Sequence, residues 1–404
     1  MVEVTTMEVT TDFVHNNYKM VRPPRREEVS VGDFADRDLL LTADLASPAM
    51  SAFISNRYSE YKKLSFPLWK RFKLTGMTLP DISVRHRTKY TDPNAKPMIS
   101  LSSDEVELLD RLDFEGSDRK LLLLGDICFS EGTMISVPPR KRVSKPYVIP
   151  FSRDSRIMNN LFVSGKGSSI KLVIDSTSSG NWLLQNNRFL IKEDSTVEVL
   201  YINRMTERGY GFSNNLYFLE KNAKLRVVEA STGNASMAVF HMVLLEGEGA
   251  QASVEPLFVA RGDTVLDMHY VVKAISRNSE GMISGSGVLL DNGRSVFRGT
   301  LDMRKGAKGS KASEHSSVLM LSQKARADTI PSLLVGESEV EASHAATVGS
   351  VDEQRVFYLM SRGFSRERAI RFIVQGTFEP VLKEIDKIFP TFTGVVRNEF
   401  AKEV

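Results

Sequence analysis

Apolar residues recur at helical spacing near the start of the chain and in short runs through its middle. Between Ala49 and Leu64 they recur at helical spacings, and Ser47-Pro48 resembles a helix N-cap followed by proline. From about Leu121, short apolar runs alternate with short polar turns. This change predicts a small helical region followed by a β-rich core.

The β-rich stretch carries an irregular repeat. Ile191, Leu219 and Leu245 precede similar polar turns at offsets of 28 and 26 residues, and Leu290 lies 45 residues further on, which leaves room for two shorter coils. Repeats of this length predict a β-solenoid, in which each coil buries its apolar face only against its neighbours. A β-sandwich with similar strand spacing is the alternative. We favour the solenoid because the turns repeat in composition as well as in spacing.

A compact group of helices is predicted after the β core. The sequence Ser-Val-Asp-Glu at 350–353 reads as a capping box, and Gly363 lies where a left-handed helix end is expected. A second helix is predicted from 365 to 376, and a third opening near Pro380. The chain is therefore divided into a flexible arm (1–45), an N-terminal helical region and connector (46–115), a β core (116–348) and a C-terminal helical domain (349–404).

Composition and charge narrow the possible functions. Hydrophobic residues make up 42% and charged residues 25%, and no apolar run is long enough to span a membrane. The net charge of +3 does not favour nucleic acid as a partner. The absence of a secretory signal and the single cysteine, Cys128, predict a reduced, cytoplasmic protein, and Cys128 itself is expected to be buried and inert. Without a Walker motif, no nucleotide site is expected in this chain.

Two histidines near the end of the β region are candidate metal ligands. His315 and His344 lie 29 residues apart, close to one coil, so we expect them on adjacent rungs. With Glu314 and Glu341 nearby, they would form a site for a borderline divalent metal. The alternative is that His344 only stabilises the junction between strands and helices. The basic stretch from Arg304 is interpreted either as a solvated loop or as an anion or partner contact.

Two stretches in the last third of the chain carry a family resemblance. GAKGSKASEHSSVLMLSQKARADTIPSLLV, from Gly306, and SHAATVGSVDEQRVFYLMSRGF, from Ser343, resemble the SufB/SufD family of iron–sulfur cluster assembly proteins. SufB-type chains carry a cysteine where this chain has Ser316, and His-Glu-Ala-Thr where it has His-Ala-Ala-Thr from His344. The sequence therefore resembles the SufD branch.

The resemblance implies a right-handed parallel β-helix flanked by helical regions, in a non-catalytic cytoplasmic scaffold. The implied partners are a SufB-type paralogue, or a second copy of this chain, and a SufC-type ABC ATPase that hydrolyses ATP. His344 is the implied ligand for transient iron or a nascent iron–sulfur cluster at a subunit interface, and His315 is a weaker candidate. The partner contact is expected to involve Val356, Phe357, Tyr358, Leu359, Arg362, Phe364, Ile370, Phe372 and Ile373. A β-helix polysaccharide lyase or hydrolase, and a structural adaptor that binds no metal, are the alternatives.

Overall fold

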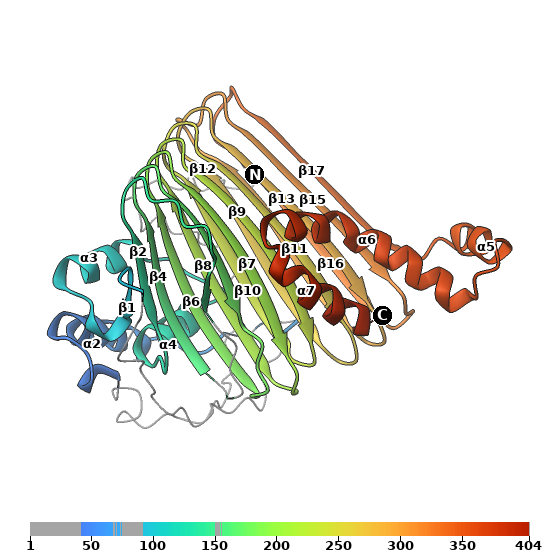
Figure 1. Cartoon of the computed structure of the whole chain (residues 1–404), viewed down its shortest axis with the longest axis horizontal. Helices are drawn as coiled ribbons and strands as arrows, with labels where there is room; N and C mark the ends of the chain where they lie inside the picture. The colour runs from blue at the N-terminus through green and yellow to red at the C-terminus, as the bar shows by residue number, and fades with distance from the viewer. Residues whose placement is uncertain are drawn as a thin grey trace, which may run out of the picture.

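The computed structural model describes residues 42–67, 69, 71, 72, 74, 92–149, 154 and 156–403. Most of the predicted arm, 1–45, and part of the predicted connector lie outside these residues. Within the described residues, strands alternate between two sheets, so that each coil contributes one strand to each sheet (Figure 1). All named strand pairs are parallel except β1 with β2. The predicted β-solenoid is confirmed, and the sandwich alternative is not.

The first sheet contains, in order, β1 (Ala95–Pro97), β2 (Thr133–Val137), β4 (Arg156–Ser164), β6 (Trp182–Ile191), β8 (Tyr210–Leu219), β10 (Ser236–Leu245), β12 (Val265–Ala274), β14 (Arg294–Met303) and β16 (Arg326–Val335). The second contains β3 (Tyr147–Ile149), β5 (Ser169–Asp175), β7 (Thr196–Met205), β9 (Lys224–Gly233), β11 (Gln251–Ala260), β13 (Glu280–Leu289), β15 (Lys311–Met320) and β17 (Glu341–Ser350). The helices are α2 (Pro48–Tyr61), η1 (Met98–Ser100), α3 (Ser103–Arg111), α4 (Arg119–Ile127), α5 (Glu353–Ser361), α6 (Arg366–Ile388) and α7 (Pro390–Glu403). No described helix is both long enough and apolar enough to cross a bilayer.

The repeat seen in the sequence corresponds to one full coil. Ile191 pairs with Leu219, and Leu219 with Leu245, on successive strands of the first sheet. The next rung then brings Ala274 beside Leu245. The prediction that Leu290 follows in this series is wrong, because Leu290 comes directly after β13 of the second sheet. Each coil has two polar turns of similar composition, one at each end of its strands. The sequence pattern does not distinguish the turn that follows a first-sheet strand from the turn that follows a second-sheet strand.

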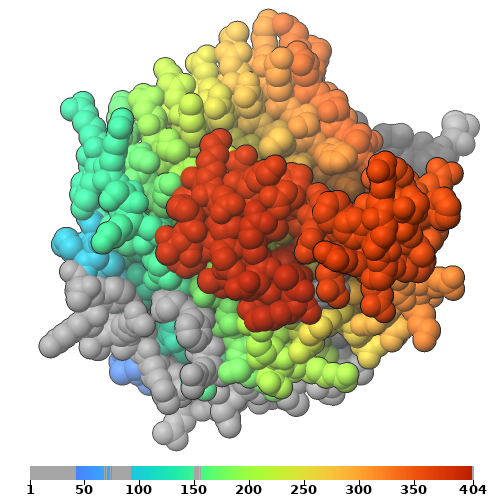
Figure 2. Space-filling view, turned by 45° about the vertical axis from the view of Figure 1, so that its right-hand side comes forward, coloured from blue at the N-terminus to red at the C-terminus, as the bar shows by residue number. Residues whose placement is uncertain are grey.

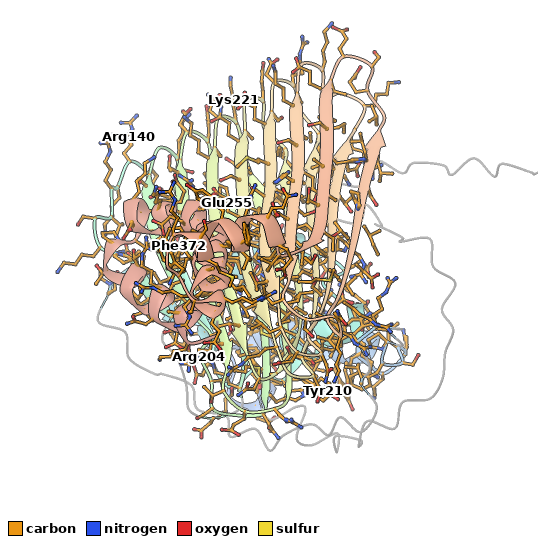
Figure 3. All side chains as sticks on the ribbon, turned by 90° about the vertical axis from the view of Figure 1, so that its right-hand side faces the viewer. Arg140, Arg204, Tyr210, Lys221, Glu255 and Phe372 are labelled. Atoms are coloured by element: carbon orange, nitrogen blue, oxygen red, sulfur yellow. The ribbon has the colours of Figure 1, made fainter. Side chains whose placement is uncertain are left out.

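Many turns place an Asn or Asp in the left-handed backbone region. Asp194, Asn222, Asn278 and Asp291 have φ between 49° and 57°. Asn and Asp tolerate this conformation better than other side chains that carry a Cβ. Asn222 Nδ2 also donates to Asp194 Oδ1 of the coil before it, at 3.0 Å. In Figure 3, Lys221 marks the end of the solenoid where this turn lies. The polar turns are therefore specified by conformation as well as by solubility.

Three apolar clusters hold the elements together. The first fills the interior of the solenoid, the second lies between the N-terminal helices and the first sheet, and the third lies between α6, α7 and the second sheet. Figure 2 shows the C-terminal helices as a ridge raised on the face of the solenoid. Arg226 also forms an ion pair with Glu384 of α6 at 2.7 Å, and Arg204 with Glu399 of α7 at 2.9 Å. Both sheets are thus covered by helices over part of their outer faces.

The N-terminal region corrects one prediction. The stretch from Leu121, assigned to the β core, is the helix α4, and the strands β2 and β4 come after it. All four residues from Leu121 to Leu124 are buried, so the helix shows no polar face in this part of its sequence. The predicted cap at Ser47 is confirmed, since its side chain accepts a hydrogen bond from Met50 N. Cys128, at the end of α4, is buried as expected.

The C-terminal helices differ from the predicted pattern in two places. The N-cap of α5 is Asp352, whose carboxylate accepts from two backbone N–H groups, because β17 continues to Ser350. The helix α6 runs on through Gly376 and Pro380, so the predicted break between two short helices is wrong. Packing of the apolar face of α6 on the second sheet outweighs these local signals. The predicted left-handed Gly363 is confirmed, with φ of 91°.

Candidate functional site

The last rungs of the solenoid bring His344 beside Glu314. His344 on β17 pairs in register with Glu314 on β15, whereas His315 pairs with Ala345. Because side chains alternate across a strand, Glu314 and His344 share the inward face and His315 lies on the outward face. His344 is exposed, since no further rung covers it among the described residues. The structure therefore does not bring the two imidazoles together, but it does bring His344 to a carboxylate.

Glu314 is a buried carboxylate without a hydrogen-bond partner of normal geometry among the described residues. It is 2% exposed, and neither carboxylate oxygen has a partner of normal geometry among the described residues. Burial raises the pKa of Glu314, and this effect outweighs the opposing influence of the Ser316 hydroxyl and of the imidazoles of His344 and His315. A buried polar group without a partner destabilises a fold, so such a group in a native protein needs an explanation.

Further polar groups and a glycine surround this carboxylate. Ser316 Oγ and Thr329 Oγ1 are also buried without a hydrogen-bond partner in the described part of the chain. Both residues belong to the same inward-facing series of positions, on β15 and β16. Across the interior, a Cβ added at Gly299 would lie 2.4 Å from Glu314 Cγ. The glycine leaves the space that the Glu314 side chain occupies. We call Glu314, Ser316, Thr329 and His344 the terminal cluster.

A second polar cluster lies deeper inside the solenoid and is fully paired. His241 Nε2 lies 3.1 Å from Glu229 Oε2, and Tyr270 donates to the same oxygen at 3.0 Å. Tyr217 donates to Tyr201 at 2.8 Å and also contacts His241. All five side chains are fully buried. Burial raises the pKa of Glu229, but His241 and the neighbouring donors outweigh it and lower the pKa overall. This cluster therefore acts as satisfied polar packing.

The interior between the two clusters is apolar. The ring of Phe297 packs beside Tyr270, with ring centroids 5.2 Å apart, and is stacked on Phe258 at 6.3 Å. A Cβ at Gly285 or Gly287 would meet the rings of Phe297 and Phe258, respectively, at 2.5 and 2.1 Å. The rings thus fill the interior and separate the paired cluster from the terminal cluster.

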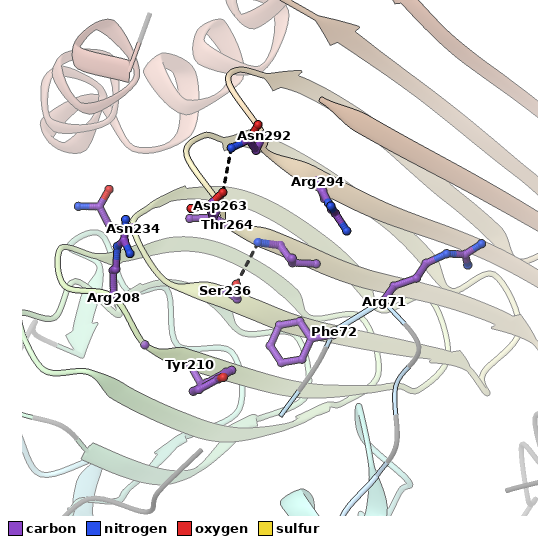
Figure 4. Close-up of a pocket in the computed structure, with 12 residues that line it drawn as sticks. Arg71, Phe72, Arg208, Tyr210, Asn234, Ser236, Asp263, Thr264, Asn292 and Arg294 are labelled. Atoms are coloured by element: carbon purple, nitrogen blue, oxygen red, sulfur yellow. Dashed lines mark hydrogen bonds between the residues drawn. The ribbon is translucent and has the colours of Figure 1, made fainter. Parts of the chain in front are cut away.

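A hollow of about 580 Å³ opens where the first-sheet strands β8 to β14 begin (Figure 4). Arg71, Arg208 and Arg294 surround it. Asp263 is the one carboxylate among its lining residues, and it accepts a hydrogen bond from Asn292 at 2.9 Å. Glycoside hydrolysis commonly uses two carboxylates that face each other across the bond to be cleaved. This hollow therefore gives no support to the polysaccharide hydrolase alternative, and it shares no residue with the terminal cluster.

Two other sequence candidates lie apart from the terminal cluster. In the basic stretch, Arg304, Lys308 and Lys311 each lie within 3.0 Å of an acidic residue. The acid that pairs with Lys311 is Glu341, at the start of β17, so Glu341 is engaged away from His344. Among the described residues, no three His, Cys, Asp or Glu side chains group closely enough to hold a metal ion. Any metal at the terminal cluster would need further ligands from water or from another chain.

The predicted partner-binding residues differ in how far their side chains are exposed to solvent. Phe357 and Tyr358 on α5 and Phe372 on α6 are 73%, 57% and 56% exposed. Arg362 is exposed as well, and its guanidinium lies over the Tyr358 ring at 5.3 Å. Val356 is 1% exposed and cannot contact a partner as the helices stand. The remaining members, Leu359, Phe364, Ile370 and Ile373, are half-buried.

The sequence identified only some of the exposed apolar side chains on α5 and the first turns of α6. Met360, which sequence reasoning missed, is 44% exposed on α5. In Figure 1, α5 and the beginning of α6 project beyond the edge of the sheets. We call Phe357, Tyr358, Met360 and Phe372 the helical arm surface. Thr329 was also missed as a candidate, and the strand register places it beside Phe297 on the inward face of the last rung.

The chain is similar to proteins of one assembly system. The family described as "SUF system FeS cluster assembly, SufBD core domain" matches residues 151–377. Over 141 residues the chain is 39% identical to "Iron-sulfur cluster assembly protein SufD" of Bacillus subtilis (strain 168). This matched stretch covers 35% of this chain and 32% of that protein. Over 279 residues it is 26% identical to an "Iron-sulfur cluster assembly SufBD family protein" of Staphylococcus epidermidis, with 67% of this chain and 60% of that protein covered. The matches thus span less than two thirds of the length of these relatives.

Proposed function

Because this chain belongs to the SufBD family of the SUF iron–sulfur cluster assembly system, we propose that it is a non-catalytic, SufD-like scaffold subunit that works in the cytoplasm. It pairs with a SufB-type chain and with a SufC-type ABC ATPase, and His344 assists the handling of iron or of the nascent cluster. The iron–sulfur cluster is the cargo of this assembly. The observation that carries the proposal is the open last rung of the solenoid, with His344 on it.

The last rung supports pairing with another β-helix. Strands β16 and β17 end the two sheets in the described chain, so the outer edges of both strands lack a neighbour. Leu334 and Val335 on β16 are 47% and 56% exposed, and Val348 on β17 is 40% exposed. An exposed strand edge with apolar side chains is a template for pairing with a strand of another chain. A SufB-type chain that pairs there would add its own ligands beside His344.

The helical arm surface supports binding of the ATPase. Phe357, Tyr358 and Phe372 present large apolar side chains to water on a projecting helix pair, and Figure 3 shows Phe372 on its helix. Aromatic residues with a nearby arginine are the common composition of binding hot spots. Because α6 continues from this surface onto the second sheet, movement of a bound ATPase would be transmitted to the β-helix through one helix.

Co-expression with a SufB-type chain and a SufC-type ATPase tests the proposal. Purification through a tag on this chain should recover both partners. The variant Phe357→Ser/Phe372→Ser should lose the ATPase and keep the SufB-type chain. Val395→Ser is the matched control, because Val395 is 47% exposed on α7, outside the arm surface, and this variant should keep both partners. Recovery of neither partner with the unaltered chain would contradict the proposal.

The role of His344 is tested on the same complex. His344→Ala changes an exposed side chain, so the fold and the complex should persist. The iron and sulfide content after anaerobic reconstitution should fall. An unchanged content, in a complex that still forms, would instead favour a structural adaptor. Light scattering on this chain alone distinguishes a homodimer from a monomer that waits for the SufB-type chain.

A further inference from the structure

The terminal cluster contains a carboxylate, that of Glu314, whose burial is not explained by a scaffold function alone. Glu314 is 2% exposed, and both of its carboxylate oxygens lack a hydrogen-bond partner among the described residues. By contrast, the other interior glutamate, Glu229, accepts hydrogen bonds from Asn203, Ser231 and Tyr270. The interior of this solenoid therefore satisfies a carboxylate where the carboxylate is structural. Glu314 is left unsatisfied.

The surroundings of Glu314 leave it open on one side only. Towards the middle of the solenoid, β13 packs beside β15, and the inward residue paired with Glu314 is the buried, apolar Ile283. Across the interior, Gly299 leaves room for the side chain. On the remaining side stands His344 of the last rung, which is exposed. The end of the solenoid, on the side of the imidazole, is therefore the direction from which a ligand would approach the carboxylate, although both of its oxygens are covered as the structure stands.

We propose that Glu314 and His344 together bind a divalent cation of the Fe²⁺ type at the open end of the solenoid interior. Imidazole nitrogen and carboxylate oxygen are both suitable ligands for such an ion. The bound cation supplies the partner that the buried carboxylate lacks. Ser316 Oγ, two residues along the same inward face of β15 and without a hydrogen-bond partner of normal geometry, can hold a water ligand. The inference deepens the proposed function and rests on it for the identity of the ion as iron.

The arrangement also separates Glu314 from the other acidic and basic candidates. His315 lies on the outward face of β15, and Glu341 is paired with Lys311. Neither belongs to the proposed site, although the sequence places both within a few residues of it. His315 and Glu341 therefore serve as matched controls for His344 and Glu314, because each has the same side chain as its counterpart but lies outside the proposed site.

Calorimetric titration of the full chain with Co²⁺, and with Fe²⁺ under anaerobic conditions, tests the proposal. Glu314→Gln and His344→Ala should each weaken binding by at least about tenfold, as loss of even a supporting group does at metal sites. His315→Ala and Glu341→Gln should leave the affinity unchanged. Binding by Glu314→Gln as tight as that of the unaltered chain, or no binding by the unaltered chain, would overturn the inference.

A stability measurement keeps a purely structural role apart from metal binding. Without metal, Glu314→Met should be as stable as the unaltered chain or more stable, because it removes a buried carboxylate that has no partner. With Co²⁺ present, only the unaltered chain should gain stability, by mass action. A destabilised Glu314→Met without metal would show that the carboxylate supports the fold, and this result would overturn the proposal.

The two proposals fail differently. If the partners co-purify but Glu314→Gln keeps its metal affinity, the cation site is wrong and the scaffold function stands. If the chain binds Co²⁺ through Glu314 and His344 but recovers no partner, the scaffold function is wrong and the site stands.

Discussion

The contact between α4 and the first sheet contains a fully buried ion pair beside its apolar cluster. Arg188 Nη2 lies 2.8 Å from Asp126 Oδ2, and both side chains are 0% exposed. Arg188 also donates to the backbone oxygen of Leu112 at 3.0 Å and to Asn159 Oδ1 at 3.2 Å. Asp126 Oδ1 accepts from Asn186 at 2.9 Å. Every charged atom of the pair is therefore paired, at the cost of removing both charges from water.

Arg188→Met should destabilise the protein by about 3–5 kcal/mol, because it leaves the Asp126 carboxylate buried without its counter-charge. The amides of Asn186 and Asn159 still donate to Asp126 Oδ1, but neutral donors compensate a charge only in part. The double variant Arg188→Met/Asp126→Leu should recover most of this loss, since apolar replacement of a whole buried pair is often close to neutral. The contrast between the single and the double variant is the test of the electrostatic argument.

Urea unfolding followed by tryptophan fluorescence measures both effects. Trp182 is 1% exposed and belongs to the same apolar cluster between the helices and the first sheet, so it reports on this contact. A loss below about 1 kcal/mol in Arg188→Met, the size of an ordinary exposed pair, would refute the reasoning. So would a double variant that is less stable than the single variant, because the cost would then lie in lost packing and hydrogen bonds.

Three further predictions concern stability. Burial raises the pKa of Asp113, but Arg119 and Arg57 outweigh it and lower the pKa to about 2, from 3.8. The ionised Asp113 carboxylate should thus stabilise the fold by about 2 kcal/mol above pH 4, and this stabilisation should be lost as the pH falls towards 2. The urea midpoints of Asp113→Asn and of the unaltered chain should therefore converge between about pH 4 and pH 2. Gly287→Ala should cost about 1–3 kcal/mol, because the new Cβ meets Phe258 at 2.1 Å; an unchanged urea midpoint would show that the ring moves aside freely. Gly376→Ala, on an exposed position of α6 with nothing within 4 Å, should raise the unfolding free energy by up to about 1 kcal/mol, and a lower midpoint would contradict this.

The sequence predicts the solenoid well because two separate features, the apolar residues and the polar turns, repeat with the length of one coil. Apolar residues such as Ile191 and Leu219 repeat at the coil length, and the turns repeat Asn and Asp at left-handed positions. Helix boundaries are predicted less well. At Pro380 a local breaker is overridden by packing on a sheet that the local sequence does not contain. The run of buried leucines that begins at Leu121 shows neither a helical nor a strand-like spacing of polar residues. The sequence alone therefore does not show that this run forms a helix.

The candidate site depends on strand register, which the sequence does not give. From spacing alone, His315 and His344 are 29 residues apart and should meet. The register shows a 30-residue offset on this rung, so His344 pairs with Glu314. A shift of one residue moves a side chain to the other face of a strand. The sequence therefore identified His344 and named Glu314 as one of its possible neighbours, but only the coordinates show that Glu314 shares its inward face and that His315 does not.

The two ends of the first sheet differ in what they allow. At the start, β1 is three residues long, ends at Pro97 and runs antiparallel across β2. A short strand that ends in proline offers an incoming strand few main-chain donors, so this edge is a poor template for extension of the sheet. Among the described residues, β16 forms the other edge of this sheet, and no strand neighbours its outer side. If two such molecules paired through β16, each would occupy the open edge of the other, and the first sheet would then favour a closed pair over a growing filament.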